Sequence, residues 1–458
     1  MRSQSPWNAR LPEGSGSSAE RLADVLGSDI LHGILSVGDR LPAHRDLAWR
    51  LGIGIGSVTR AYAILERRGL VRAEHGRGSF VAARADNPSI LLDMSTNMPP
   101  PMFSDRALAR TLSRLARTVD AALFNVYPPV AGHIEHRRIM AHWLTGCGIE
   151  IDPENLLLTG GAQQALSVAF TVARPHVGSI ITEEVTYPGM LDTVRREGKT
   201  LQSIAMDARG MMPDGLEAAL SSPQTGRALV YVTPTLHNPT TACMDSDRVH
   251  AIAQLCRRFD ALVIEDGVYA GQSKLNHTLA ALIPERTFHV SSLSKIISPG
   301  LRIGALAPPA AFAAQTLPVL LASSLMIAPL SYAMMAQWLS DGTASSVRQS
   351  LRAEAARRRN LARNILGKRM TEPGGDGFHL WLPMDASTAE NVAENAKALG
   401  VSIAPPSAFA SCDTLQTTGV RLALGAVSFK NLTVALTRIR QACELVERKV
   451  SRDTIVLG

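Results

Sequence analysis

The segment SSLSKIISPGLRIG, residues 291–304, is the stretch around which the rest of the chain is organised. A strand-like run leads into it, and small residues then place Lys295 and Arg302 seven positions apart. A primary amine condenses with an aldehyde, whereas a guanidinium cannot do so but binds phosphate well. Ser292 and Ser294 add hydroxyl donors. The spacing therefore predicts a site that holds an aldehyde and a phosphate at once.

Lysine is scarce in this chain, since only seven of its 47 Lys and Arg residues are lysines. This scarcity argues against generic surface charge at Lys295, although a Ser-Lys dipeptide alone is typical of a solvated loop. Ser273-Lys274 provides an internal comparison, because the same dipeptide is followed there only by Leu-Asn-His. The prediction of an aldehyde and phosphate site therefore rests on the residues that follow Lys295, above all Arg302.

Length and charge set broad limits on the protein. A chain of 458 residues is long enough for two or three domains with a large core. The formal net charge is +7, and residues 1–85 contain twelve arginines against eight Asp and Glu, a local balance of 12 − 8 = +4. A basic amino-terminal part permits an acidic partner such as nucleic acid without proving one.

The cysteines and the apolar segments indicate a cytoplasmic protein. Five dispersed cysteines form no Cys-x-x-Cys pair, which favours a reducing compartment and predicts no metal site. The first residues lack the apolar run of a signal peptide. Residues 303–340 carry no Asp, Glu, Lys or Arg, but four prolines interrupt them before they reach the ~20 residues of a membrane helix. We expect buried helices and a subunit interface there.

The amino-terminal part has the periodicity of a small helical module after a leader, residues 1–17, that is expected to be disordered. Helices are predicted over 19–31, 43–51 and 57–68, with a glycine-rich turn between the last two. Residues 69–81 then read as two short strands around a basic tip. Spacing alone allows either a helical cap on an enzyme or a helix-turn-helix that crosses DNA.

The stretch from GDRLPAHRDLA through SVTRAYAILERRGLVRAEHGRGSFV resembles the winged helix-turn-helix of GntR-family repressors. The resemblance implies a DNA-binding domain over 18–82, in which phosphate contacts position the module and side chains of the second helix face the major groove. Gly54 and Ile55 depart from the Ser or Thr and the polar residue usual in that family, so the operator is expected to differ from typical sites. The implied DNA contacts are Arg45 and Arg77 to phosphates, and Ser57, Thr59 and Arg60 to the groove.

Two further segments predict parts of a ligand site from local chemistry. Residues 156–166 read as strand, glycine turn and helix, and the first amides of such a helix bind anions, so Gly161, Ala162 and Gln163 are candidate phosphate ligands. The apolar strand before Asp266 ends in acids, which places a carboxylate at the end of a buried strand. Either feature alone is also common in ordinary folds.

Together with the Lys295 segment, these stretches resemble fold-type I aminotransferases over residues 120–430. The resemblance implies pyridoxal phosphate (PLP) bound as an internal aldimine, a Schiff base on Lys295, and a mostly parallel sheet with ligands at its carboxyl edge. Gly267 replaces a second aspartate often found in the family, which is expected to affect loop geometry. The implied roles are phosphate binding by Ser292, Ser294, Arg302 and, in a neighbouring subunit, Tyr127; ring stacking by Tyr187; hydrogen bonds to the ring hydroxyl by Asn238 and Tyr269; ring-nitrogen pairing by Asp266; and effector carboxylate pairing by Arg421.

Taken together, the two halves of the chain resemble the MocR-type regulators, in which a GntR-like winged helix is fused to an aminotransferase-like domain. The expected fold is α/β, with a linker at 83–92, a large part at about 93–340 and a small part at about 341–458. This implies a regulator that binds operator DNA and senses PLP, an amino acid or an amine, as a homodimer with domain swapping. Two alternatives stay open: an aminotransferase with a DNA-binding extension, since the residues for transamination are present, and a DNA-binding protein whose large domain is only a scaffold.

Overall fold

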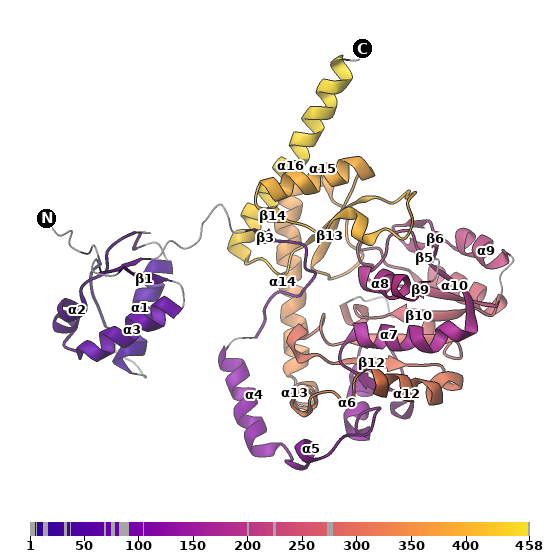
Figure 1. Cartoon of the computed structure of the whole chain (residues 1–458), viewed down its shortest axis with the longest axis horizontal. Coiled ribbons are helices and arrows are strands. Elements are labelled where there is room, and N and C mark those ends of the chain that lie inside the picture. The colour runs from indigo at the N-terminus through magenta and orange to yellow at the C-terminus, as the bar shows by residue number, and fades with distance from the viewer. Residues whose placement is uncertain are drawn as a thin grey trace. The chain divides into compact units, whose positions relative to one another are not determined.

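The computed structural model describes residues 5, 7–11, 17–31, 34–36, 38–67, 70–74, 78–81, 91–103, 105–198, 201–222, 226–272 and 278–456. The chain forms two compact units, Met1–Leu91 and Leu92–Gly458 (Figure 1). The division falls within the segment 83–92 that the sequence indicates as a linker.

The amino-terminal unit is a winged helix-turn-helix, as predicted. Its elements are α1 (Ser18–Leu31), α2 (His44–Leu51), α3 (Ile55–Arg67), β1 (Val71–Glu74) and β2 (Gly78–Val81). The two strands pair antiparallel to form the wing. Gly52 ends α2 in the left-handed conformation with φ 64°, which a glycine adopts without a steric penalty. Leu26, Leu47 and Val58 of the three helices are fully buried in a core of this unit's own.

Part of the segment expected to be a disordered leader is packed against this core. The Trp7 side chain is 3% exposed and belongs to the same hydrophobic cluster as α1. Its indole Nε1 donates a hydrogen bond of 2.9 Å to Asp29 Oδ2, and Arg10 forms an ion pair of 2.5 Å with the other oxygen of Asp29. The Ser, Gly and Pro content of the leader concealed this contact, because a single buried tryptophan contributes as much apolar area as several small residues.

The second unit is built on a seven-stranded sheet in the order β4-β12-β11-β10-β9-β5-β6. All pairs are parallel except those of β12, which runs antiparallel to β11 and β4. The short connection from β11 to β12 leaves no room for the crossover helix that a parallel neighbour requires. The strands are β4 (Leu157–Thr159), β5 (Val177–Glu183), β6 (Leu201–Ile204), β9 (Arg227–Val232), β10 (Leu262–Asp266), β11 (Thr287–Ser292) and β12 (Gly304–Ala307).

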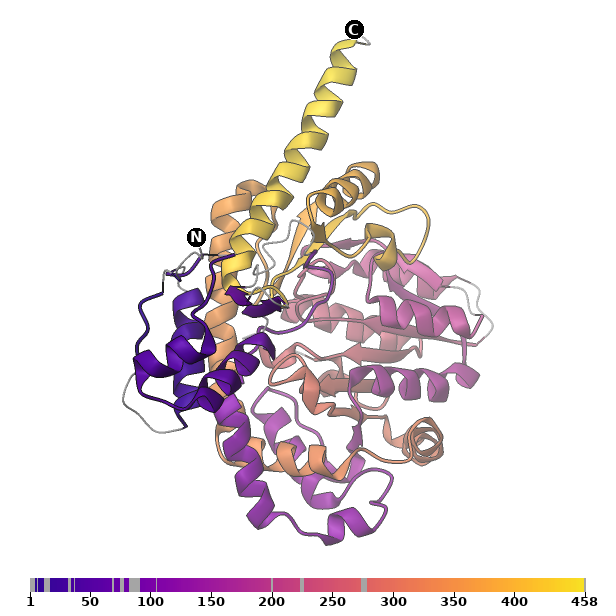
Figure 2. The same cartoon turned by 60° about the vertical axis from the view of Figure 1, so that its left-hand side comes forward.

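Helices cover both faces of the sheet, as Figures 1 and 2 show. Alternate residues of β9 enter different cores: Leu229 and Tyr231 pack with α7, whereas Val230 and Val232 pack with α9 and α10. A strand buried on both faces is expected for a parallel sheet. The helices of this part are α4 (Asp105–Thr118), α5 (Ala122–Asn125), α6 (Ile134–Thr145), α7 (Ala162–Ala173), α8 (Pro188–Arg196), α9 (Pro213–Ser221), α10 (Ser246–Arg258), α11 (Leu279–Leu282), α12 (Ala313–Ser323) and α13 (Pro329–Ser340).

The small part follows the long helix α14 (Thr343–Leu366). Its elements are β13 (His379–Pro383), α15 (Ala386–Ala398), β14 (Val401–Ser402), β15 (Gly419–Ala423) and α16 (Phe429–Val456), whose last turns project from the unit (Figures 1 and 2). β3 (Leu92–Asp93) pairs with β14, and Met94 is buried in the core of the small part. The chain therefore starts this unit in the small part, whereas the sequence-based division placed residues from 93 onward in the large part. Two-residue strands carry too little pattern to be recognised in a sequence.

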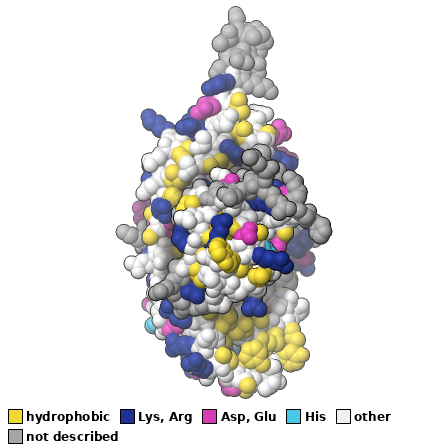
Figure 3. All heavy atoms as spheres, turned by 90° about the vertical axis from the view of Figure 1, so that its left-hand side faces the viewer, with side chains coloured by type: hydrophobic (Ala, Val, Ile, Leu, Met, Phe, Trp, Pro, Cys, Tyr) yellow, Lys and Arg dark blue, Asp and Glu magenta, His cyan; other side chains and the backbone are white. Residues whose placement is uncertain are grey.

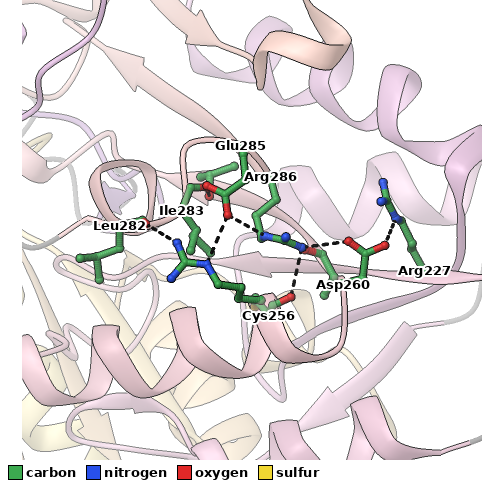
Figure 4. Close-up of polar contacts among 10 residues, drawn as sticks. Arg227, Cys256, Asp260, Leu282, Ile283, Glu285 and Arg286 are labelled. Carbon is green, nitrogen blue, oxygen red and sulfur yellow. Dashed lines mark hydrogen bonds and ion pairs between the residues drawn. The ribbon is translucent and has the colours of Figure 1, made fainter.

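The amino edge of the central strands is held by charged side chains (Figure 4). Arg286, directly before β11, donates to Asp260 Oδ1 at 3.1 Å and to the Cys256 carbonyl at 3.3 Å. Arg227, at the start of β9, donates to the other oxygen of Asp260 at 2.5 Å. These contacts join the starts of three neighbouring strands, β9, β10 and β11. The polar side chains that they use lie at the edge opposite to the one where ligands are expected.

The uncharged segment 303–340 forms β12, α12 and α13. No helix in the described part of the chain is long and apolar enough to cross a membrane. Among the described residues, no group of three or more His, Cys, Asp or Glu side chains is arranged to hold a metal ion.

Candidate functional site

A cavity of about 450 Å³ lies at the carboxyl edge of the sheet. Its size is within the usual range for small-molecule sites. Seven of the residues proposed from the sequence line it, and they come from six separate segments of the chain. These residues are Ala162, Tyr187, Asn238, Asp266, Tyr269, Lys295 and Arg421.

Lys295 follows β11, and its Nζ donates a hydrogen bond to the backbone carbonyl of Asn97. Burial lowers the pKa of Lys295 to about 8, and the positive charges of Arg421 and Arg302 act in the same direction, while Asp266 opposes them. A lysine with such a pKa has a substantial fraction of neutral, nucleophilic amine near neutral pH.

Asp266 ends β10 and is 4% exposed. Tyr231, on the neighbouring strand β9, donates a hydrogen bond of 2.9 Å to Asp266 Oδ2, and the Val268 amide lies 3.3 Å from Oδ1. Burial raises the pKa of the Asp266 carboxyl, whereas these hydrogen bonds and the charge of Lys295 lower it. A buried carboxylate of this kind gains most from a cationic partner placed in the cavity.

Arg421, in the middle of β15, is almost fully buried. Its Nη1 donates to Asn238 Oδ1 at 3.0 Å, its Nη2 donates to the Ser95 carbonyl, and the guanidinium lies 4.8 Å from the Phe409 ring centre. Burial lowers the pKa of Arg421 to about 10. The guanidinium is thus held by neutral acceptors and an aromatic ring, which leaves its charge available for an anion.

The two tyrosines proposed as ring contacts line the same cavity. Asn97 Nδ2 donates a hydrogen bond of 2.8 Å to the Tyr269 hydroxyl. The Tyr187 ring packs over Gly189, where an added Cβ would lie 2.5 Å from Tyr187 Cε1 and 2.3 Å from Gln163 Oε1. Gly189 therefore keeps the space that the Tyr187 ring and the Gln163 side chain occupy.

The expected phosphate ligands come together beside the cavity at the start of α7. Gly161 has φ 108°, and a Cβ there would lie 2.7 Å from Arg302 Nη2. Arg302 Nη2 also donates to the Gly160 carbonyl at 2.9 Å. Arg302 itself has φ 55°, a conformation that costs a non-glycine residue free energy and that aims its side chain at this corner. The helix start and the guanidinium together form an anion-binding corner.

Two buried polar atoms of these expected phosphate ligands have no hydrogen-bond partner among the residues that the structure describes. Ser292 Oγ is used within the turn, since it donates to the Ile303 carbonyl and accepts from the Ser294 amide. Ser294 Oγ and Gln163 Oε1, by contrast, are buried and unpartnered. An unpaired buried hydroxyl costs ~1–3 kcal/mol, so a ligand oxygen that accepts from Ser294 would be stabilised. The residues present therefore fit a phosphate-bearing cofactor.

Tyr127 is the one proposed cofactor residue that lies apart from the cavity of its own chain. It is 75% exposed, in the segment after α5. A tyrosine with that much exposed ring is available to another molecule. The role suggested for it, in the site of a neighbouring subunit, stays a prediction.

Sequence reasoning missed several residues of the site. Asn97 and Ser95 lie in a proline-flanked segment without periodicity, and Tyr231 sits inside an apolar strand where it reads as core. His289 was also missed: its ring fills the space beside Gly267, where a Cβ would lie 2.5 Å from His289 Cε1. The only hint in the sequence was Gly267 itself: a glycine in place of the aspartate common in the family leaves space that another side chain can fill, and His289 fills it.

The winged helix-turn-helix presents most of its proposed DNA contacts on its surface. Arg45 and Arg60 are exposed, and Ser57 is half-buried near the start of α3. The Thr59 hydroxyl is already engaged, because it donates to the Ile55 carbonyl and lies 3.1 Å from His44 Nδ1. Arg77 lies outside the described residues. An additional residue stands out on α2: Trp49 is 86% exposed, four positions after Arg45.

These features define a class of protein: an aminotransferase-type cofactor-binding fold joined to a winged helix-turn-helix. The chain belongs to the family of class I and II aminotransferases, which matches residues 89–439, and residues 18–81 match the gntR family of bacterial regulatory proteins. The combination is that of the MocR-type regulators.

Three curated proteins resemble this chain over most of its length. The chain is 25% identical to the uncharacterized HTH-type transcriptional regulator YdeF of Bacillus subtilis, covering 87% of this chain and 88% of the relative. It is 28% identical to the vitamin B6 salvage pathway transcriptional repressor PtsJ of Salmonella typhimurium (81% and 86%). It is 27% identical to the pyridoxine biosynthesis transcriptional regulator PdxR of Corynebacterium glutamicum (82% and 85%).

Solved aminotransferases share the fold. An archaeal alanine:glyoxylate aminotransferase superposes with a TM-score of 0.70 at 21% identity, covering 86% of this chain and 95% of the enzyme. The kynurenine aminotransferase of Pyrococcus horikoshii superposes with a TM-score of 0.68 at 22% identity, covering 78% and 91%.

Proposed function

We propose that this protein is a DNA-binding transcriptional regulator that binds PLP covalently through Lys295 and responds to PLP or to an amino compound. The observation that carries the proposal is the meeting of Lys295 and Asp266 in one cavity, beside the unpartnered Ser294 hydroxyl, in a chain that also folds a winged helix-turn-helix. The named roles of PtsJ and PdxR in vitamin B6 metabolism support a PLP-related signal.

Each residue of the site has a role in this proposal. The start of α7, Ser294 and Arg302 bind the phosphate, and Lys295 holds the aldehyde carbon as a Schiff base. Asp266 pairs with the ring nitrogen, and Tyr231 keeps its carboxylate oriented. When bound, PLP supplies an electron-withdrawing ring and an exchangeable linkage to an amine. An amino-acid effector would place its carboxylate at Arg421, and its amino group would compete with the Lys295 amine for the aldehyde carbon.

The DNA-binding role rests on the exposed helices of the amino-terminal unit. Arg45 and Arg77 would contact phosphates, while Ser57, Thr59 and Arg60 would approach the major groove. Thr59 must exchange its bond to His44 for one to a base, so His44 is a further candidate contact. The target is double-stranded operator DNA, and the compartment that this requires is the bacterial cytoplasm.

We also propose that the regulator is a homodimer. α4, α5 and the segment after them expose large hydrophobic side chains, and Figure 3 shows hydrophobic side chains gathered at the lower end of the molecule, where Figure 1 draws α4 and α5. Exposed apolar surface of this kind is typical of an interface. Tyr127 would then reach the partner's phosphate site. The residues concerned are Leu108, Leu112, Phe124, Val126 and Tyr127.

A mobility-shift titration of the full chain against the intergenic DNA upstream of its own gene, with and without PLP, tests the function. Specific binding that changes with PLP is expected. The proposal is overturned if the protein binds that DNA no more tightly than unrelated DNA, both with and without PLP. That result would favour an aminotransferase with an amino-terminal extension. Sustained turnover of an amino acid and a keto acid would support that second candidate, since Lys295, Asp266 and Arg421 line one cavity.

A further inference from the structure

A second cavity, of about 830 Å³, lies between the large and small parts of the carboxyl-terminal unit. One wall consists of β7 (Met206–Asp207) and the loop 240–243, and the opposite wall contains β13 and the segment 415–418. Its lining shares no residue with the cavity of about 450 Å³ that contains Lys295, which is called the cofactor cavity below. It is nearly twice as large and has no role in PLP binding as proposed above.

An aromatic ring is built into this second cavity. Trp381 lines it and lies directly opposite Arg421 in the antiparallel pair β13–β15. Gly419 lies two residues before Arg421 on β15, and a Cβ there would lie 2.3 Å from the Leu382 carbonyl oxygen and 2.8 Å from Trp381 Cζ2. A larger residue at 419 would clash with the backbone and with the indole, so the glycine leaves room for the ring in the wall.

The charges of the wall are acidic. Asp207, Glu372 and Asp385 line the cavity, and none of its described lining residues is Lys, Arg or His. Asp207 is paired with Arg248 at 2.8 Å and Glu372 with Arg363 at 2.6 Å. Asp385 caps α15 instead, accepting from the Thr388 amide and the Ser387 hydroxyl at 2.9 Å each, and no cation among the described residues pairs with it. One carboxylate thus remains for a cationic ligand.

We propose that this cavity is a second small-molecule site, and that it binds an aromatic organic cation. The ammonium group lies near Asp385 and the apolar body of the ligand packs against the Trp381 indole. A cation is attracted both by the carboxylate and by the face of a tryptophan ring, whereas a neutral or anionic ligand of the same size gains neither interaction.

The second cavity shares a loop with the cofactor cavity. Residues 236–241 carry Asn238, which bonds Arg421 on the cofactor side, and Thr241, which lines the second cavity. Leu236 and Thr241, at the two ends of the loop, adopt φ values of 49° and 65°. The buried Thr241 hydroxyl has no hydrogen-bond partner in the described part of the chain. Strain of this kind costs ~1–3 kcal/mol per residue, so a ligand that touches Thr241 can shift the loop and loosen Asn238 from Arg421.

Benzyltrimethylammonium is a suitable probe, because a quaternary ammonium cannot condense with PLP at Lys295. Calorimetric titration of the full chain is expected to show one saturable site per chain, with benzyl alcohol binding more weakly. Asp385→Asn keeps the helix cap, since Asn and Asp cap equally well, and is expected to weaken binding roughly two- to tenfold. Trp381→Leu is expected to do the same, because the ligand loses the aromatic surface against which its apolar body packs. Asp152→Asn, which alters another capping aspartate outside the lining, is the matched control.

The outcomes separate this inference from the proposed function, because the titration needs neither DNA nor PLP. The site is refuted if saturable binding is absent, or if Asp385→Asn and Asp152→Asn bind the probe equally well. Only the coupling rests on the proposed function: the probe should change PLP affinity by the same factor as PLP changes probe affinity. If PLP affinity were the same with and without saturating probe, the coupling between the two cavities would be refuted, while the second binding site would still stand.

Discussion

Arg421 and Asn238 are bonded to each other across the cofactor cavity, with Arg421 Nη1 donating to Asn238 Oδ1 at 3.0 Å. The sequence suggested separate ligand groups for these residues, an effector carboxylate for one and a ring hydroxyl for the other. A carboxylate can bind the guanidinium without displacing either acceptor, because Arg421 Nε has no hydrogen-bond partner among the described residues and each Nη atom carries a second N–H. Such a charge-assisted contact is stronger than the two bonds to neutral oxygens.

Lys295→Ala should abolish the visible absorption band that PLP gives when it is bound to lysine. Weak, noncovalent PLP binding should remain, because the start of α7 and Arg302 still bind the phosphate. The exposed Lys430 provides a control, and Lys430→Ala should leave the band intact. Absorption spectra at saturating PLP decide the matter. A full band in Lys295→Ala would assign the linkage to another lysine.

The rate of covalent PLP attachment should rise with pH around a midpoint near 8, because the reactive form is the neutral amine and the pKa of Lys295 is lowered to about 8. Arg421→Met removes a positive charge that lowers this pKa, so the midpoint should move upward. Stopped-flow absorbance over a pH series measures it. The prediction fails if both proteins share a midpoint near that of an ordinary lysine.

The same lowered pKa makes a second prediction, for stability. Below pH 8, Lys295 is charged in both states and its burial opposes folding of the PLP-free protein. As pH rises from about 8 to 10.5, the unfolded chain holds more protons and the free energy of unfolding rises. Lys295→Met should therefore be more stable than the parent near pH 7 by up to ~3 kcal/mol, with the difference shrinking toward pH 10.5. Urea unfolding at several pH values tests this.

Gly161→Ala should weaken PLP binding about tenfold or more, because its Cβ meets Arg302 Nη2 and displaces a charge-assisted phosphate contact. Gly300→Ala is the matched control: the nearest side-chain atom to its Cβ is 3.8 Å away, and its φ is not positive. Fluorescence titration with PLP compares the two. If Gly161→Ala and Gly300→Ala bound PLP with equal affinity, Arg302 would not contact the phosphate.

Arg60→Ala should cost ~1–3 kcal/mol of operator binding and relax sequence preference at one position, if Arg60 reads a base. Arg45→Ala should weaken binding to all DNA alike and lower the salt dependence by about one phosphate contact. Mobility shifts on operator variants at several salt concentrations distinguish them. Equal loss on every sequence would make Arg60 a phosphate contact too.

The sequence predicted the two folds and most of the cofactor cavity, because these depend on local signals. The glycine turn before α7, the acid at the end of β10 and the Lys295 segment each combine a strand with distinctive chemistry. Asn97 was not predictable: it reaches the cavity only because β3 pairs with β14, a contact between residues more than 300 positions apart. Trp7 was hidden by the composition around it.

The self-contained core of the amino-terminal unit has a practical consequence. Trp7, Leu26 and Val81 close that core without help from the rest of the chain, and the unit ends at Leu91. It is therefore an exchangeable unit: replacing residues 1–91 with a winged helix of known operator would yield a chimera whose reporter gene responds to whatever ligand the carboxyl-terminal unit senses. Such a chimera would separate what the protein senses from where it acts on the genome.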